Sequence, residues 1–122
     1  MTAVLFISHG SHSRQAKSEI LRLVRQLKKR IRVPIFQYAF LEINQPTIPS
    51  GISACIKKGA KRIFVILNFL NSGEHALKDI PRIIDKAIAK HPHVAVQISP
   101  PIGQHPRMRR LYAEVIRKKL QK

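Results

Sequence analysis

A short apolar run that ends at His9 and Gly10 places the strongest constraint on how this chain folds. Residues Ala3 to Ser8 are nearly all apolar and too few for a helix, so they predict a strand buried on both faces. Gly10 allows a tight turn toward a helix opened by Ser11 or Ser13. The run therefore favours an open α/β sheet with His9 at the carboxyl end of a strand, where such sheets bind ligands.

Strand and helix patterns then alternate along the whole chain. Three more strands are expected at Pro34–Leu41, at Lys61–Leu67 and around Val94, Val96 and Ile98, where 100–103 break the last one. Amphipathic patterns predict helices at about Ser13–Ile31, from Ile48 to a stop at Gly59, from Ile80 to near Lys90 with Pro81 in the first turn, and from Met108 through Ile116. We predict a single α/β domain over residues 1–122, with a four-stranded parallel sheet between helices on both faces.

Length and composition agree with one cytoplasmic domain. The 122 residues are 44% hydrophobic, enough for a core without disulfides or a structural metal. The single cysteine, Cys55, falls in an apolar helical pattern and is interpreted as a small core residue in a reducing compartment. No apolar run approaches the ~20 residues of a membrane span, and the N-terminus lacks the features of a signal peptide. We expect a soluble protein that does not bind membranes.

The charge balance is unusual, with 23 Lys and Arg against 6 Asp and Glu and a net charge of +17. Such a field attracts polyanions, and nucleic acid is the simplest candidate. The basic residues, however, fall mostly on predicted helix faces and helix ends, where cations are solvated. Aromatic residues are not interleaved with them as a single-strand binding platform requires. We expect nucleic-acid binding to be non-specific at most.

The expected topology brings polar residues from four loops to one rim of the sheet. These are His9, Glu42, His75 and the segment that ends in His105. Imidazole and carboxylate groups at one rim bind divalent first-row metals or exchange protons near neutral pH. Taken singly, a histidine here could be a simple hydrogen-bonding residue, and Glu42 could be a metal ligand, a proton acceptor or a cap for the following turn.

The remaining histidines carry weaker signals. His12 lies in the helix-opening turn, where a solvated or capping role is as plausible as ligation. His91 and His93 flank Pro92 at the opposite end of the sheet, and we assign them no role.

Four motifs in order resemble the small sirohydrochlorin cobaltochelatase family, in the class II tetrapyrrole chelatases. They are His9-Gly10-Ser11, Ala39-Phe40-Leu41-Glu42 with Pro46, Phe69-Leu70-Asn71-Ser72-Gly73-Glu74-His75 with Asp79-Ile80-Pro81, and Pro100-Pro101-Ile102-Gly103-Gln104-His105-Pro106. The similarity covers essentially the whole chain. Larger relatives hold two such units in one chain, so this chain resembles the homodimeric short form, with a chelatase-like fold comparable to half of the larger one.

The resemblance implies that the chain inserts a divalent metal into sirohydrochlorin without nucleotide hydrolysis. His9 and His75 match the two metal-binding, proton-accepting histidines, with Glu42 as a further catalytic candidate. Because sirohydrochlorin is a polycarboxylate, backbone amides and nearby cations would receive it and the positive field would steer it. The expected substrate-binding residues are Gly10, Ser11, Arg14, Asn71, Ser72 and Gly73.

The metal is the open part of this expectation. Cobalt comes first by resemblance, and nickel or iron, for coenzyme F430 or sirohaem, are alternatives on the same scaffold. The chain lacks a Walker-type Gly-Lys-Ser/Thr motif, in agreement with a reaction that needs no ATP. Two non-enzymatic alternatives stand beside it: a metal carrier or sensor that uses the same histidines without turnover, and a basic nucleic-acid-binding module.

Overall fold

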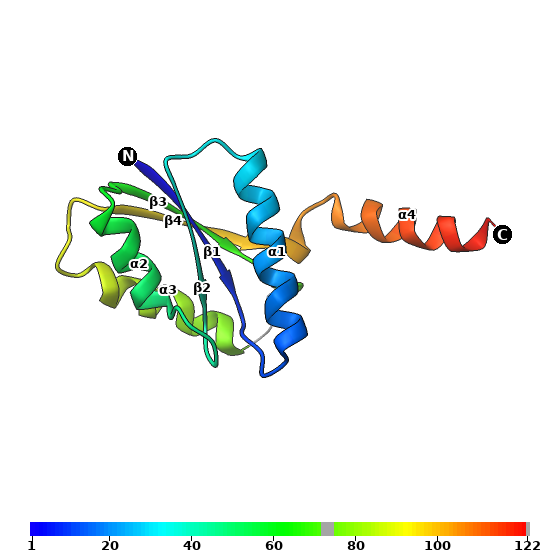
Figure 1. Cartoon of the computed structure of the whole chain (residues 1–122), viewed down its shortest axis with the longest axis horizontal. Coiled ribbons are helices and arrows are strands. Elements are labelled where there is room, and N and C mark those ends of the chain that lie inside the picture. The colour runs from blue at the N-terminus through cyan, green and yellow to red at the C-terminus, as the bar shows by residue number, and fades with distance from the viewer. Residues whose placement is uncertain (72–74, 122) are drawn as a thin grey trace.

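Four parallel strands in the order β2-β1-β3-β4 form the centre of the computed structural model, which describes residues 1–71 and 75–121, without the side chains of 75 and 76 (Figure 1). The elements are β1 (Thr2–Ser8), α1 (Arg14–Arg30), β2 (Ile35–Phe40), α2 (Ile48–Lys57), β3 (Arg62–Leu67), α3 (His75–Ile88), β4 (Ala95–Pro101), the short 3-10 helix η1 (Ile102–Gln104) and α4 (Met108–Leu120). The predicted α/β class, parallel sheet and strand number are confirmed.

The main core lies between the sheet and the pair α2 and α3. Alternate residues of the two central strands point to this face and are almost fully buried, as are the inward residues of both helices. Its large side chains that are less than 2% exposed are Leu5, Ile7, Ile48, Ile52, Ile63, Val65, Ile80 and Ile84. Cys55 belongs to this core, as predicted, and its burial raises the pKa of the thiol from 9.0 to about 11, against a smaller opposing effect of Lys58.

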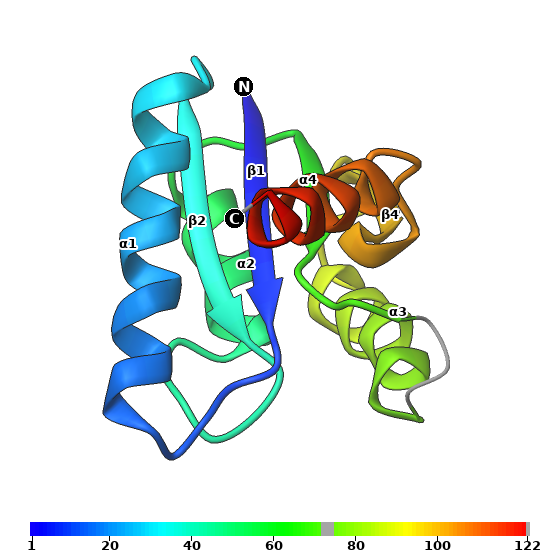
Figure 2. The same ribbon diagram turned by 90° about the vertical axis from the view of Figure 1, so that its right-hand side faces the viewer.

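Helix α1 lies on the other face of the sheet, so helices cover both faces as expected (Figure 1). It begins after Ser13, whose Oγ accepts a hydrogen bond from the N–H of Ala16 at 3.1 Å. Of its residues, Val24 is buried, at 3% exposure. Helix α4 does not fold back over the sheet but projects away from the body (Figures 1 and 2).

Two expectations about prolines are wrong. We expected Pro81 in the first turn of its helix, but α3 begins at His75 and Pro81 lies inside it, where the buried face formed by Leu77, Ile80 and Ile84 holds the helix together. We expected Pro100 and Pro101 to end the last strand, but β4 runs through both of them. Because β4 pairs with β3 alone, it is an edge strand, and an edge tolerates residues without an N–H.

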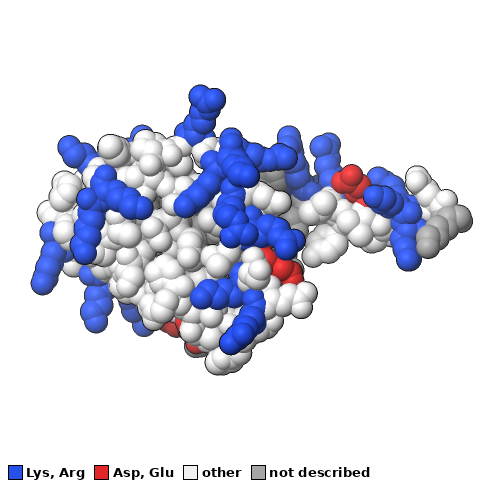
Figure 3. Space-filling model, in the orientation of Figure 1, with Lys and Arg blue, Asp and Glu red and all other residues white. Residues whose placement is uncertain are grey.

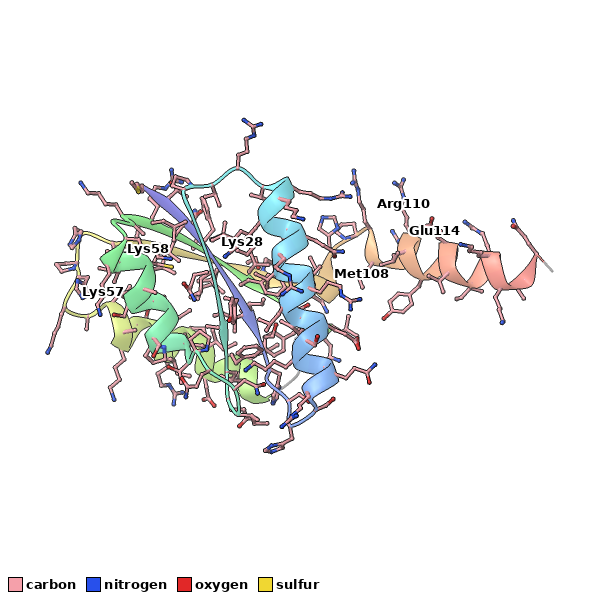
Figure 4. The ribbon with its side chains drawn as sticks, viewed as in Figure 1. Lys28, Lys57, Lys58, Met108, Arg110 and Glu114 are labelled. Atoms are coloured by element: carbon pink, nitrogen blue, oxygen red, sulfur yellow. The ribbon has the colours of Figure 1, made fainter. Side chains whose placement is uncertain are left out.

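Basic side chains cover much of the surface, on the body and along α4 (Figure 3). Lys57 and Lys58 lie at the end of the molecule opposite to α4, so the charge does not gather in one patch (Figure 4). This distribution agrees with a solvated surface and a general positive field. Within residues 1–71 and 75–121, no helix combines the length and apolar character needed to span a membrane.

Candidate active site

His9 and Glu42 meet at the carboxyl rim of the sheet, as the sequence predicts. Nε2 of His9 lies 2.7 Å from Oε1 of Glu42, and the side chains are 42% and 58% exposed. Hydrogen bonds beyond the ends of the strands fix this approach: the N–H of Leu41 donates to Ser8 O at 2.9 Å and the N–H of Glu42 donates to His9 O at 3.0 Å. The parallel pairing of β1 with β2 therefore positions the two groups.

The loop after β1 turns at Gly10 and is fastened to the loop after β2. Gly10 has a φ of +109°, a conformation that L side chains rarely adopt. The next residue, Ser11, donates its backbone N–H to Oδ1 of Asn44 at 2.7 Å. Asn44 in turn donates its own N–H to Glu42 O at 2.8 Å. Asn44 thus links the loop that carries His9 to the loop that carries Glu42.

This bond changes the expected role of Ser11. We expected its backbone amide to receive a substrate carboxylate, but in the structure that amide has an acceptor in Asn44. The Ser11 hydroxyl accepts the N–H of Ser13 at 3.0 Å and keeps its own O–H as a donor. The sequence analysis assigned Asn44 no role at this site, so its side-chain contact with Ser11 is one that it missed.

Asn68 and Phe69, in the segment after β3, support the site, and the sequence analysis gave them no role. Nδ2 of Asn68 donates to Oγ of Ser8 at 3.1 Å, and its backbone N–H donates to Ile7 O at 2.8 Å. The Phe69 side chain is 7% exposed and its ring centroid lies 6.2 Å from that of His9. Their place in the sequence could have identified them, because they follow the carboxyl end of a buried strand, as His9 does, and such positions form the ligand sites of open α/β sheets.

A hollow of about 440 Å³ opens beside His9, between the end of β1 and the start of α1. Its lining includes Ser8, His9, Gly10, Ser11, Lys17 and Asn68. Among the described residues that line it, Lys17 is the cation and Glu19 the anion, whereas the expected Arg14 is exposed and lies outside the lining. Lys17 is therefore a residue that sequence reasoning missed, one helical turn beyond the predicted one.

The other predicted residues are only partly placed. His75 is the first residue of α3 rather than a loop residue. Its side chain, and the whole of Ser72 and Gly73, lie outside the residues that the structure describes. Asn71 and His12 are exposed. Nδ1 of His105 accepts the N–H of Arg107 at 3.1 Å, which gives this ring a local structural contact.

His91 and His93 lie near each other, with ring centroids 6.1 Å apart, in the connection between α3 and β4. This is the amino end of β4, opposite to the rim that carries His9, as predicted. They are therefore far from the candidate site.

The described groups are suited to metal and proton chemistry. Imidazole and carboxylate are both ligands for first-row divalent metals, and a carboxylate bonded to one ring nitrogen fixes the tautomer and orientation of a ligating histidine. Among the described side chains there is no cluster of three or more His, Cys, Asp or Glu residues that could hold a metal ion. The described site is thus an accessible pair of groups rather than a closed structural metal centre.

Comparisons with known proteins agree on one family. The family model described as CbiX matches residues 3–119. A sirohydrochlorin ferrochelatase from Priestia megaterium is 38% identical over 103 residues, which are 84% of this chain and 39% of that protein. A sirohydrochlorin cobaltochelatase from Methanocaldococcus jannaschii is 37% identical over 84 residues, 69% of this chain and 59% of that protein. The chain therefore spans about two fifths to three fifths of these relatives.

The fold also matches a solved structure over its full length. The crystal structure of a putative cobalamin biosynthesis CbiX protein from Marinobacter aquaeolei aligns with a TM-score of 0.86 at 23% identity. The alignment covers 99% of this chain and 96% of that one, so it extends into α4.

Proposed function

Because the chain belongs to the CbiX family, we propose that it inserts a divalent metal ion into sirohydrochlorin, with cobalt as the first metal and nickel or iron as alternatives. The observation that carries the proposal is the 2.7 Å contact between His9 Nε2 and Glu42 Oε1 at the carboxyl rim. Relatives named as cobaltochelatase and ferrochelatase support the same substrate with different metals. Metal and tetrapyrrole are both substrates here.

In the proposed mechanism, His9 presents the metal and accepts a proton. Metallation exchanges a divalent ion for two pyrrole N–H protons, so a group near the macrocycle must take up protons as the metal leaves its ligands. A neutral imidazole performs both tasks, and the carboxylate of Glu42, 2.7 Å from Nε2, orients the ring. His75, the first residue of α3, is proposed as the second histidine.

The hollow beside His9 is proposed to receive carboxylates of sirohydrochlorin. The backbone amide of Gly10, the hydroxyl of Ser11 and the ammonium group of Lys17 supply donors from one side. The expected set of Arg14, Asn71, Ser72 and Gly73 would contact other carboxylates of the large macrocycle. The net charge of +17 would raise the association rate of such a polyanion.

We further propose that the active form is a homodimer in the cytoplasm and that it uses no nucleotide. One unit of 122 residues offers one rim, which is a small wall for a macrocycle. Its longer relatives carry additional chain that a second copy could replace. The direct exchange of a metal for protons requires no phosphoryl transfer.

The test is metallation without ATP. Purified protein is mixed anaerobically with sirohydrochlorin and Co²⁺, Ni²⁺ or Fe²⁺, and the visible spectrum of the tetrapyrrole gives initial rates. We expect acceleration over the protein-free reaction, greatest for Co²⁺. His9→Ala and His75→Ala should each nearly abolish it, since each removes a proposed ligand and proton acceptor. The His9 side chain is 42% exposed, so its removal takes little volume from the core.

His91→Ala and His93→Ala are the matched controls, because they remove imidazoles at the far end of the sheet and should keep the wild-type rate. The proposal is overturned if no metal is inserted faster than in the control, or if both active-site variants keep full activity. Metal binding without tetrapyrrole metallation would instead identify a carrier.

A further inference from the structure

The two faces of the sheet are covered unequally. Helices α2 and α3 together pack on one face and bury the main core. On the opposite face, α1 is the one helix that packs among the described elements, and it lies toward β2 (Figure 2). A layer that covers a four-stranded sheet ordinarily needs more than one helix. Part of this face therefore has no helix of its own chain over it.

An apolar groove of about 410 Å³ marks the uncovered region. It lies beside α1 and its lining is almost wholly apolar, including Val4, Phe6, Leu23, Leu27, Ile66 and Ile102. Leu23 and Ile102 are 37% and 41% exposed. Large aliphatic side chains of β1, β3, α1 and η1 thus remain in contact with water, where their burial would be favourable.

Helix α4 carries an apolar stripe that no other part of the chain covers among the described residues. None of residues 108–120, all of which the structure describes, is buried. One side of the helix carries an apolar stripe at three- and four-residue spacing, formed by Leu111, Tyr112, Val115, Ile116 and Leu120, which are 51–75% exposed. The other side carries Arg110 and Glu114 (Figure 4). A 13-residue helix whose apolar stripe is exposed has only marginal stability in water. Packing of the stripe against an apolar surface would stabilise it.

The segment that connects β4 to α4 directs the helix away from the apolar groove of the same chain. Gly103 donates its N–H to Phe69 O at 3.0 Å, and a Cβ on Gly103 would fall 1.6 Å from Leu70 O, so the chain here passes backbone to backbone. Ile102, the preceding residue, lines the groove itself. The chain thus lines the groove at Ile102. Helix α4 then runs away from the body of the molecule (Figure 1).

We propose that two copies of this chain exchange their α4 helices, so that the apolar stripe of each helix lies in the groove beside α1 of the other. Each copy has an α4 whose apolar stripe is unburied and an apolar groove that no helix of its own chain fills. A two-fold axis places each stripe in the partner's groove, and the dimer is then closed to further copies. The exchanged helix completes the second helical layer over the sheet. This inference deepens the homodimer of the proposed function by naming the surfaces that form it.

The exchange also joins the partner to the active site. Asn68 lines both the apolar groove and the hollow beside His9. A helix seated in the groove therefore lies next to the hollow. That helix carries Arg109, Arg110, Arg117, Lys118 and Lys119 against one acidic residue, Glu114. The second copy would bring positive charge and an additional wall to a site that receives a polycarboxylate.

Charge predicts how this dimer responds to salt. Each copy carries +17, so two copies repel each other while the apolar contact attracts them. Salt screens the repulsion, with a Debye length of ~8 Å at about 0.15 M and ~3 Å at about 1 M. We expect the dimer to tighten with increasing salt, opposite to binding held by ion pairs.

The test is sedimentation velocity with four variants and no metal or tetrapyrrole. The wild type should sediment at twice the protomer mass of 13.9 kDa. Val115→Asp in the stripe and Leu23→Asp in the groove should each weaken the dimer at least tenfold. Arg110→Gln on the far side of α4 and Arg22→Gln on α1 make the same change in charge and should leave the dimer unchanged. Circular dichroism should show a folded chain in all four.

Mixing the two interface variants gives the specific signature of exchange. In a mixed dimer, the intact helix of the Leu23→Asp copy meets the intact groove of the Val115→Asp copy, so mixing should restore dimer that neither variant forms alone. A monomeric wild type, or a Val115→Asp variant as dimeric as wild type, would overturn the exchange. Metallation by a monomer would overturn the exchange and leave the chelatase proposal standing. A dimer that does not metallate sirohydrochlorin would overturn the chelatase proposal and leave the exchange standing.

Discussion

The Cα atom of Gly10 lies so close to the backbone of Glu42 that a Cβ at Gly10 would fall 1.9 Å from the Glu42 carbonyl oxygen and 3.0 Å from its carbonyl carbon. The obstacle is backbone, which cannot rotate aside as a side chain would. Gly10 therefore holds together the two loops that carry His9 and Glu42.

Replacement of Gly10 by alanine should displace one of these loops. We expect Gly10→Ala to lower the free energy of unfolding by at least about 3 kcal/mol, since positive φ and a backbone clash add. Gly59→Ala is the control, because Gly59 has a φ of +100° but the nearest atom to its added Cβ is 3.8 Å away. It should cost only about 1–2 kcal/mol. Urea unfolding curves of both variants measure the difference, and equal losses would contradict the clash.

The carboxylate of Glu42 should control how His9 binds metal. Glu42→Gln keeps the shape of the side chain but removes the negative charge beside Nε2, 2.7 Å away. Loss of a carboxylate partner of a ligating histidine typically weakens metal affinity about 10–100-fold. Calorimetric titration with Co²⁺ should show this weakening. Glu114→Gln, an equal change of charge on α4, should bind Co²⁺ as the wild type does.

Lys17 lines the hollow and Arg14 does not, so we expect Lys17 to contribute more to substrate binding. Lys17→Ala should weaken sirohydrochlorin binding and flatten its salt dependence, because a contact charge is removed. Arg14→Ala removes the same charge outside the hollow and should have the smaller effect. Fluorescence titrations at low and physiological salt compare the two. Equal effects would indicate that a diffuse field, rather than a local contact, attracts the substrate.

The buried thiol of Cys55 should make stability fall in alkali. Its pKa is about 11 in the folded chain and 9.0 in the unfolded one, so only the unfolded state loses this proton between pH 9 and 11. The contribution is fully present below pH 9 and is lost as the pH rises to 11. Cys55→Ala lacks this ionisation and should lose less stability over the same interval. Parallel curves for the two proteins would contradict the shift.

The sequence predicted the sheet, the ends of its first three strands and the His9–Glu42 pair because these follow from local periodicity and from the rule that parallel strands end at one rim. It did not predict Asn44 or Lys17, since a side chain that bridges two loops, or a residue that lines a hollow, depends on how distant segments pack. The place of α4 was not predictable either. Its amphipathic pattern reveals an apolar stripe but not the surface that the stripe meets.

The paired prolines at the end of β4 limit how these molecules can associate. An exposed strand edge offers N–H and C=O groups to other chains and is the usual starting point of fibril growth. Pro100 and Pro101 contribute no N–H, and on the inner side the hydroxyl of Ser99 accepts the N–H of Leu67 at 3.3 Å. A further strand therefore finds few donors on this part of the edge. Polymerisation through a continuous intermolecular sheet is therefore disfavoured at this end of the β4 edge.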